Sequence, residues 1–142
     1  MFNLFKIKKK SLLKEENFFS KIACLLIHAA KIDEIYTIEE KNIIRRTLID
    51  LGANTSNIEK LIADATIIEN NSNQILDFTR EIKNMPETDK NKIIESLWKI
   101  IYSNQNADIY EMNLMRRLAG LLYVDANTMG NIKEKIKKKL MK

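Results

Sequence analysis

Cys24 and His28 are one pair of side chains whose types and spacing match those of a reaction centre. Residues four apart share one side of a helix, so the thiol and the imidazole can meet, as in a nucleophilic dyad. The chain also matches itself without a gap at an offset of 71 residues, where the corresponding positions hold Glu95 and Lys99. No glycine-rich turn that would form an oxyanion hole lies nearby. We therefore interpret Cys24 as a small buried thiol and His28 as a helix-side histidine, and we predict no catalytic residue.

The acidic segment before the second predicted helix is a candidate cation site, because Asp33 and Glu40 can gather at the mouth of a helix hairpin. Calcium takes about six to eight oxygen ligands, and a calcium-binding loop has alternating acids and a central glycine that this segment lacks. In the second half, Asn104 stands at the position of the aspartate, and Asp108 and Glu111 are explained as helix caps. Asp33 and Glu40 are thus only weak candidates for a metal site, and we expect no cofactor.

Two doubled arginines are the third candidate, and they recur at the same offset. Arg46 has an acidic neighbour one turn away in Asp50, whereas Arg45, Arg116 and Arg117 have no acid four residues away on their own helices. One interpretation is that they pair with acids of the neighbouring repeat, which is a structural role and the one we favour. The alternative is an exposed site that binds a carboxylate or a phosphate group of a partner.

The net charge of +5 is unevenly distributed along the chain. Residues 1–14 carry five lysines and no acid, residues 133–142 have a net charge of +5, and residues 15–132 have a net charge of −5. This pattern is not the basic stripe of a nucleic-acid-binding protein, so we expect no specific nucleic acid as a partner. Basic ends can attract an anionic membrane surface. At the N-terminus the lysines concerned are Lys6, Lys8, Lys9 and Lys10.

Composition places the chain among soluble folded proteins. Hydrophobic residues make up 45% of it, and its length suits one compact domain. No apolar run approaches the roughly 20 residues that cross a bilayer, and the first residues lack the order of a secretory signal. The single cysteine excludes an internal disulfide and favours a reducing compartment. We expect a cytoplasmic protein, with peripheral association at the inner membrane as the alternative.

Apolar residues recur at three- and four-residue steps along nearly the whole chain, which predicts an all-α fold. Trp98 lies on such a stripe and is interpreted as part of the core, with an interface role as the lesser option. Three pairs have the spacing of a capping box, in which a side chain and a glutamate three residues later close the start of a helix. They are Thr37 with Glu40, Ser56 with Glu59, and Asp108 with Glu111.

These signals predict a compact bundle of about seven helices, in which helices one to three and five to seven form two pseudo-symmetric repeats. The predicted helices follow Phe18 to Ala30, Thr37 to Gly52, Ser56 to beyond Ala65, Ile75 to Ile82, Ile93 to Ile101, Asp108 to Leu122, and Ala126 to Leu140 after an Asp125 cap. The polar residues 69–74 are expected to link the repeats. Residues 1–14 are expected to be a basic tail or a short amphipathic segment, and residues 15–142 the helical domain.

The segment from Leu97 to Leu122 resembles the second half of TerB-like domains, which are named for tellurite-resistance protein B and also occur beside the J domain of DjlA-type co-chaperones. The shared pattern is a Leu-Trp pair, an acidic loop, a helix cap with a glutamate three residues later, and an arginine-rich apolar helix. With the first half included, the resemblance spans about residues 18 to 138. The chain departs from the pattern in the loops, where Glu34 and Gln105 replace glycines and Asn104 replaces an aspartate.

The resemblance implies an all-helical, non-enzymatic module that works in stress-response, metal-resistance or chaperone-linked complexes of bacteria. Together with the arginines that lack local partners, it leads us to expect that the chain binds a protein partner, which the sequence does not identify. The alternative is a peripheral membrane-associated stress protein that uses the basic ends. Weak metal binding, or a metal-dependent or thiol enzyme, is the remaining option.

Overall fold

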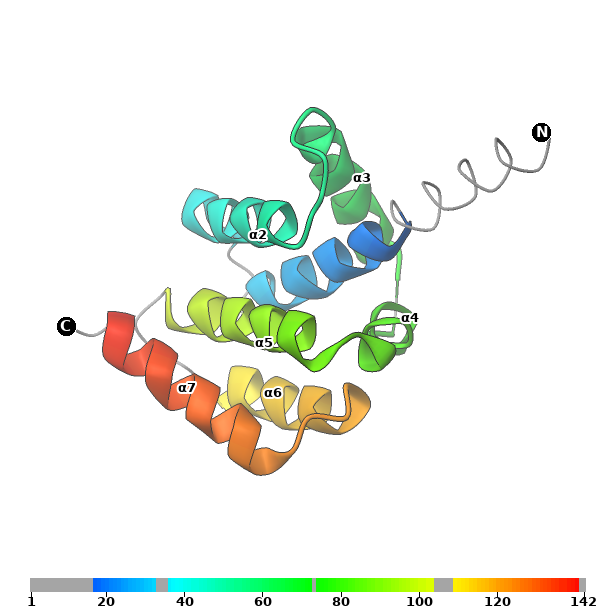
Figure 1. The fold of residues 1–142 in the computed structure, drawn as a ribbon. Helices are drawn as coiled ribbons and strands as arrows, with labels where there is room; N and C mark the ends of the chain where they lie inside the picture. The colour runs from blue at the N-terminus through cyan, green and yellow to red at the C-terminus, as the bar shows by residue number, and fades with distance from the viewer. Residues whose placement is uncertain (1–16, 33–35, 73, 104–108, 141–142) are drawn as a thin grey trace.

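The structure is a computed structural model that describes residues 17–32, 36–72, 74–103 and 109–140. In these ranges it contains seven α-helices and no strand, which confirms the predicted all-helical fold (Figure 1). The first comprises residues 17–30 and is called the N-terminal helix. The others are α2 (Ile38–Asp50), α3 (Ile58–Asn70), α4 (Leu76–Thr79), α5 (Glu87–Tyr102), α6 (Ile109–Leu121) and α7 (Ala126–Leu140).

The N-terminal helix is buried over most of its length. Residues 22–27 are fully buried, and Ala29 and Ala30 are nearly so. A helix that is apolar all round cannot lie at a surface, because one of its faces would then expose hydrocarbon to water. Figure 1 shows this helix crossing the middle of the molecule. The other helices therefore have to cover it from several directions.

Helix α5 is the second deeply buried helix. Nine of its residues are buried, among them Trp98 and the consecutive pairs Ile93–Ile94 and Ile100–Ile101. It packs against α2 and α7, and its side chains belong to the same core as those of the N-terminal helix. The two repeats predicted from the sequence thus share one hydrophobic core.

Helix α2 begins with the predicted capping box. The backbone N–H of Glu40 donates to Thr37 Oγ1 (3.1 Å), and Glu40 Oε1 accepts from the backbone N–H of Thr37 (2.9 Å). These two bonds satisfy donors that the first turn of a helix otherwise leaves without partners, and such a cap stabilises a helix by about 1 kcal/mol. The cap predicted at Asp125 is also present, since Asp125 Oδ1 accepts from the backbone N–H of Thr128 (2.7 Å). That bond lowers the pKa of Asp125.

Helices α2 and α6 end in the same way. Gly52 and Tyr123, 71 residues apart, both adopt a positive φ, of 108° and 57°. In each case the next amide donates to a carbonyl five residues earlier, as in a Schellman motif. These bonds are Ala53 to Leu48 and Val124 to Ala119, both at 2.9 Å. Glycine adopts this conformation without strain, whereas the Cβ of Tyr123 makes it unfavourable.

The bounds of α2 and α6 are related by the 71-residue offset at both ends. Buried positions also recur, and the matched pair Glu40 and Glu111 is buried in both halves. The bounds of this helix pair and the burial of its matched glutamates are therefore alike. The pseudo-symmetric arrangement of the two halves in space stays a prediction.

The capping box predicted for Ser56 and Glu59 is wrong. Helix α3 begins after Asn57, whose side chain makes no capping bond. The hydroxyl of Ser56 donates to Asn54 Oδ1 (2.8 Å), and the carboxylate of Glu59 is bound by cations of α2. The carboxylate of Glu59 forms salt bridges between α3 and α2 and therefore does not cap its own helix.

The single helix predicted from Ile75 to Ile82 is divided. The structure has α4 over Leu76–Thr79 and a separate 3-10 helix, η1, over Ile82–Asn84. The apolar spacing was interpreted correctly in one respect, because Ile75, Phe78 and Ile82 are all buried. The link between the halves is also shorter than predicted, because α3 continues to Asn70.

We predict that Tyr123→Gly stabilises the protein by about 1 kcal/mol, because glycine removes the left-handed strain at the end of α6. Urea unfolding followed by circular dichroism measures the change. Tyr123→Ala is the matched control, since it removes the ring and its contact with Lys83 but keeps the Cβ. If Tyr123→Gly were no more stable than Tyr123→Ala, strain at this position would not be the cause.

Candidate partner-binding surface

Arg45 has a partner within the fold. Its Nε lies 2.5 Å from Glu59 Oε1, and its Nη1 donates to Asn42 Oδ1 (2.5 Å). Glu59 also lies 3.8 Å from Lys41 Nζ. The expectation that Arg45 pairs with the neighbouring repeat is wrong, because Glu59 belongs to the next helix of the same half. The hydrogen bond between the two side chains raises the pKa of Arg45 and lowers that of Glu59.

Tyr36 lies beside this pair, and sequence reasoning did not single it out. Burial first, and then the charge of Glu40, raise the pKa of its hydroxyl to about 12. The hydroxyl is buried and has no hydrogen-bond partner among the residues that the structure describes. Arg45 is thus already engaged by Glu59 and Asn42, although Glu59 remains largely exposed.

Arg116 and Arg117 differ from their counterparts in the first half. Both are exposed on α6, and neither forms an ion pair with another residue in the part of the chain that the structure describes. At the positions that match Glu59 and Asp50, the second half has Gly130 and Leu121. The second half therefore keeps the arginine pair and lacks both acids that accompany it in the first half.

Helix α7 adds to the positive charge of the second half. It carries five lysines and one glutamate, and its last turn includes Lys137, Lys138 and Lys139, all exposed. Its apolar residues Met129 and Ile136 are buried in the core. The outer side of the second half is therefore rich in cations, which suits an acidic partner.

The candidate cation site is only partly within the described residues. Asp33, Asn104 and Asp108 lie outside them. Glu40 is 1% exposed, and besides its backbone bond it accepts from Thr37 Oγ1 (2.9 Å). No cluster of three or more potential metal ligands occurs in the ranges that the structure covers. Glu40 acts as a helix cap, as predicted.

Cys24 and His28 contact α3 rather than each other. Cys24 Sγ is fully buried and donates to the carbonyl of Ala65 (3.5 Å). His28 Nδ1 lies 3.2 Å from Glu69 Oε1, and Lys31 Nζ lies 2.8 Å from Glu69 Oε2. Burial raises the pKa of Cys24 to about 11, so the thiol is protonated near neutral pH. These contacts fix the N-terminal helix to α3, which agrees with the structural interpretation of both residues.

Trp98 is part of the core, as interpreted from the sequence, with 2% of its surface exposed. Its ring stacks on Tyr102 with 5.9 Å between centroids, and Lys133 Nζ lies 5.6 Å from its centroid. The indole N–H is buried and finds no hydrogen-bond partner within the described ranges. Tyr102 of α5 and Lys133 of α7 already cover the ring of Trp98, which disfavours a role for this residue at an interface.

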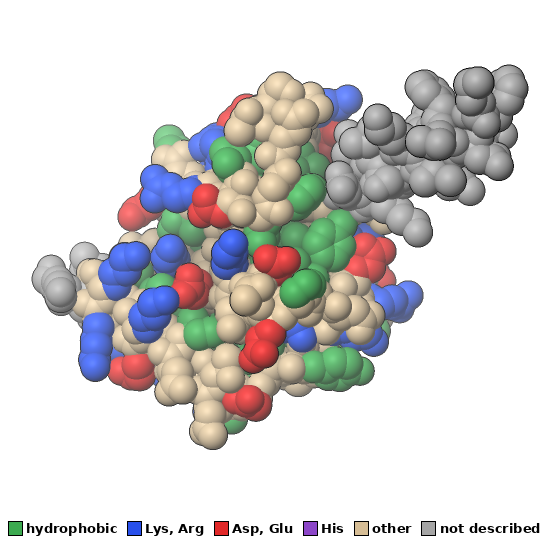
Figure 2. All heavy atoms as spheres, in the orientation of Figure 1, with side chains coloured by type: hydrophobic (Ala, Val, Ile, Leu, Met, Phe, Trp, Pro, Cys, Tyr) green, Lys and Arg blue, Asp and Glu red, His purple; other side chains and the backbone are tan. Residues whose placement is uncertain are grey.

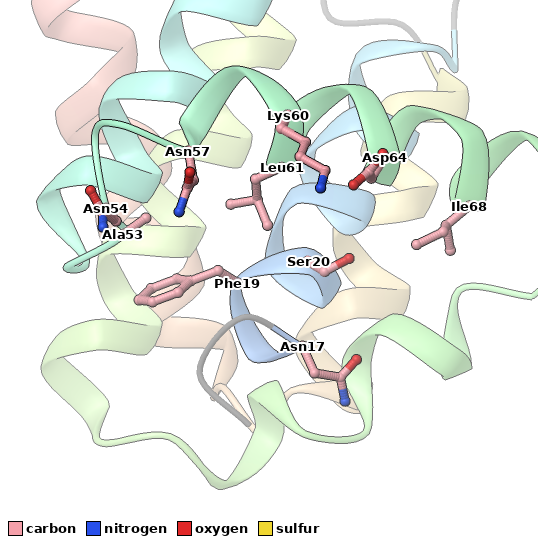
Figure 3. A pocket seen from close by; sticks show the side chains of 10 residues that line it. All are labelled: Asn17, Phe19, Ser20, Ala53, Asn54, Asn57, Lys60, Leu61, Asp64 and Ile68. Carbon is pink, nitrogen blue, oxygen red and sulfur yellow. The ribbon is translucent and has the colours of Figure 1, made fainter. Parts of the chain in front are cut away.

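One hollow, of about 460 Å³, lies between the N-terminal helix and α3 (Figure 3). Phe19 and Ser20 face Leu61 across it, and among the described residues of its lining the charged ones are Lys60 and Asp64. Because these two have opposite charges, the hollow has no charge preference. It offers amide, hydroxyl and apolar contacts without a group that selects a particular ligand.

A second hollow, of about 370 Å³, is here called the α2–α5 groove. It is lined by Ile43, Arg46, Thr47 and Asp50 of α2 and by Lys92, Glu95, Ser96 and Lys99 of α5. The sequence did not predict this groove, because it forms only where α2 and α5 meet in the fold. A difference would have revealed it, since buried Thr47 and Ser96 correspond to the leucines Leu118 and Leu25.

The candidate membrane contacts Lys6, Lys8, Lys9 and Lys10 lie outside the described residues. Within those residues, no helix has the length and apolar character needed to span a bilayer. The lysines of α7 are the basic end that the structure describes.

Comparison with known proteins agrees with the resemblance and the fold. The sequence model of the family described as tellurite resistance protein TerB matches residues 20–134. The match covers well over half of the chain, which belongs to the TerB family. Comparisons with curated proteins and with solved structures gave no match.

We predict that Cys24 is alkylated by iodoacetamide only when the protein opens, because the thiol is buried and its pKa is about 11. The rate is measured by mass spectrometry at pH 7.5, with and without denaturant. Since Cys24 is the only cysteine, the signal has a single source. Alkylation in the folded protein as fast as in denaturant would contradict this placement and would reopen the thiol-nucleophile interpretation.

Proposed function

We propose that this TerB-family domain is a non-enzymatic interaction module of a bacterial stress-response complex, of the tellurite-resistance or chaperone-linked kind. The observation that carries the proposal is the exposed pair Arg116 and Arg117, which lacks the acids that accompany the same pair in the first half. Two exposed guanidinium groups on a rigid helix can bind carboxylates with two hydrogen bonds each. The partner expected from this chemistry presents an acidic surface to α6.

The described part of the chain gives further support. Its only cysteine is buried and protonated, and its only histidine is engaged by Glu69. Neither residue is set up to begin a reaction. Family membership suggests a tellurite-resistance-like helical domain, and a cytoplasmic location is proposed on the same grounds.

Peripheral membrane association is the second candidate, and the exposed lysines at the end of α7 favour it. Attraction to anionic lipid would be electrostatic there, because the apolar side of α7 is buried in the core. Vesicle co-sedimentation with and without anionic lipid tests this candidate. Equal binding to vesicles with and without anionic lipid would exclude electrostatic association of α7 with the membrane.

We predict that Arg116→Glu with Arg117→Glu abolishes capture of the partner and leaves the fold intact, because both side chains are exposed and neither forms an ion pair with another described residue. The measurement is crosslinking of tagged full-length protein in cells of its native host, followed by mass spectrometry. Circular dichroism checks folding.

The matched control is Lys60→Glu with Arg80→Glu, which changes the net charge equally at exposed sites on α3 and next to α4. Capture should persist in this control and should weaken as salt is raised. Identical partners for all three proteins, or no reproducible partner for the unmodified chain, would refute the proposal.

A further inference from the structure

The α2–α5 groove is built from matching faces of its two helices. On α2 the lining residues lie at positions 43, 46, 47 and 50, and on α5 at positions 92, 95, 96 and 99. Both sets have the three- and four-residue spacing of a single helix face. A face of this kind normally buries apolar side chains against the opposing helix, yet most of the residues here are charged or carry hydroxyls.

The floor of the groove is a pair of hydroxyls. Thr47 Oγ1 and Ser96 Oγ lie 2.5 Å apart and are buried between the helices. Each hydroxyl also lies within hydrogen-bonding distance of a backbone carbonyl of its own helix, that of Ile43 (2.8 Å) for Thr47 and that of Lys92 (3.0 Å) for Ser96. Because each hydroxyl has one proton, one of them donates to the other, which in turn donates to its carbonyl. The desolvation cost of the hydroxyls is offset in this way, although burying them gains less than burying leucine would.

The matching positions show that the fold does not require this polar floor. Leu118 and Leu25 stand there, and both are fully buried. Leucine is larger than serine or threonine, so the small side chains of Thr47 and Ser96 leave space above them. The groove is open at this point because Thr47 of α2 and Ser96 of α5 have smaller side chains than the leucines at the matching positions.

Positive charge dominates the rim. Arg46, Lys92 and Lys99 have no ion pair with any residue described in the structure. Of the two acids in the lining, Glu95 is neutralised by Lys135 Nζ of α7 at 2.8 Å, which leaves Asp50 as the acid facing three cations. Figure 2 shows lysine and arginine side chains gathered over α2, α5 and α7 on this face.

We propose that the α2–α5 groove binds a phosphate group, with Arg46, Lys92 and Lys99 as its cationic ligands. The planar guanidinium of Arg46 can hold two phosphate oxygens, and the two lysines act as point charges from the opposite helix. Lys92 and Lys99 lie two turns apart, about 10 Å along α5, which leaves room for one or two phosphate groups between them. The bound anion also relieves repulsion among the three cations.

The size of the groove fits a small molecule or a headgroup better than a folded partner. Its volume of about 370 Å³ lies at the lower end of the usual range for small-ligand pockets. The groove is separate from Arg116 and Arg117, so it goes beyond the proposed function. The phosphate can belong to a soluble metabolite or to a lipid headgroup, and the two sources share this chemistry.

Isothermal titration calorimetry of the full chain with inorganic pyrophosphate tests the proposal. Arg46→Ala with Lys99→Ala should weaken binding at least about tenfold, because two of the three charged ligands are lost. Asp50→Asn should strengthen binding about threefold, because it removes the acid of the rim that has no ion pair with a described residue. Because unfolding cannot raise the affinity, this variant separates an effect on the groove from loss of the fold.

Arg116→Ala with Arg117→Ala is the matched control, since it removes the same charge from another exposed surface and should leave pyrophosphate affinity unchanged. Vesicles containing phosphatidic acid distinguish the sources of the phosphate. If the unmodified protein binds these vesicles and Arg46→Ala with Lys99→Ala does not, the ligand is a lipid headgroup. If the protein binds pyrophosphate but not the vesicles, the ligand is a soluble phosphate compound. No binding of either probe, or equal weakening by both arginine-containing double variants, would overturn the proposal.

Discussion

The fold depends on the burial of two helices in one shared hydrophobic core. The N-terminal helix is buried along residues 22–27, and α5 is buried from Ile93 to Tyr102 with few interruptions. Each fully buried isoleucine or leucine contributes about 1.5–3 kcal/mol relative to exposure, so neither helix is stable without the other elements around it. Helices α2, α3, α6 and α7 are consequently fixed as the cover of a shared core.

Burial also explains where the two halves are alike and where they differ. Most core positions keep apolar side chains at the 71-residue offset, because a smaller side chain there leaves a cavity. Surface positions are free of that constraint. The halves accordingly differ at Glu59 and Gly130, and in the acids beside their arginine pairs. At the α2–α5 groove, a difference between the halves reaches the buried positions Thr47 and Ser96.

The sequence was sufficient to predict features that depend on local spacing. The all-helical fold, the core role of Trp98 and the caps at Thr37 and Asp125 follow from periodicity and short-range hydrogen bonds. Features that depend on contacts between helices were not predictable in this way. The carboxylate of Glu59 is bound by Arg45, 14 residues away, and the groove requires α2 and α5 to meet across 49 residues. Exposed Arg116 and Arg117 were identified from the sequence, whereas Lys92 and Lys99 were not.

Hydrogen exchange of backbone amides tests the shared core most directly. If the N-terminal helix and α5 stabilise each other, amides of residues 22–30 and 93–102 should exchange with the same free energy of opening, equal to that of global unfolding. Both sets should lose protection together when a destabilising substitution is made in either helix. Slow exchange that persists in one helix while the other opens at lower free energy would contradict the account, because each half would then have a core of its own.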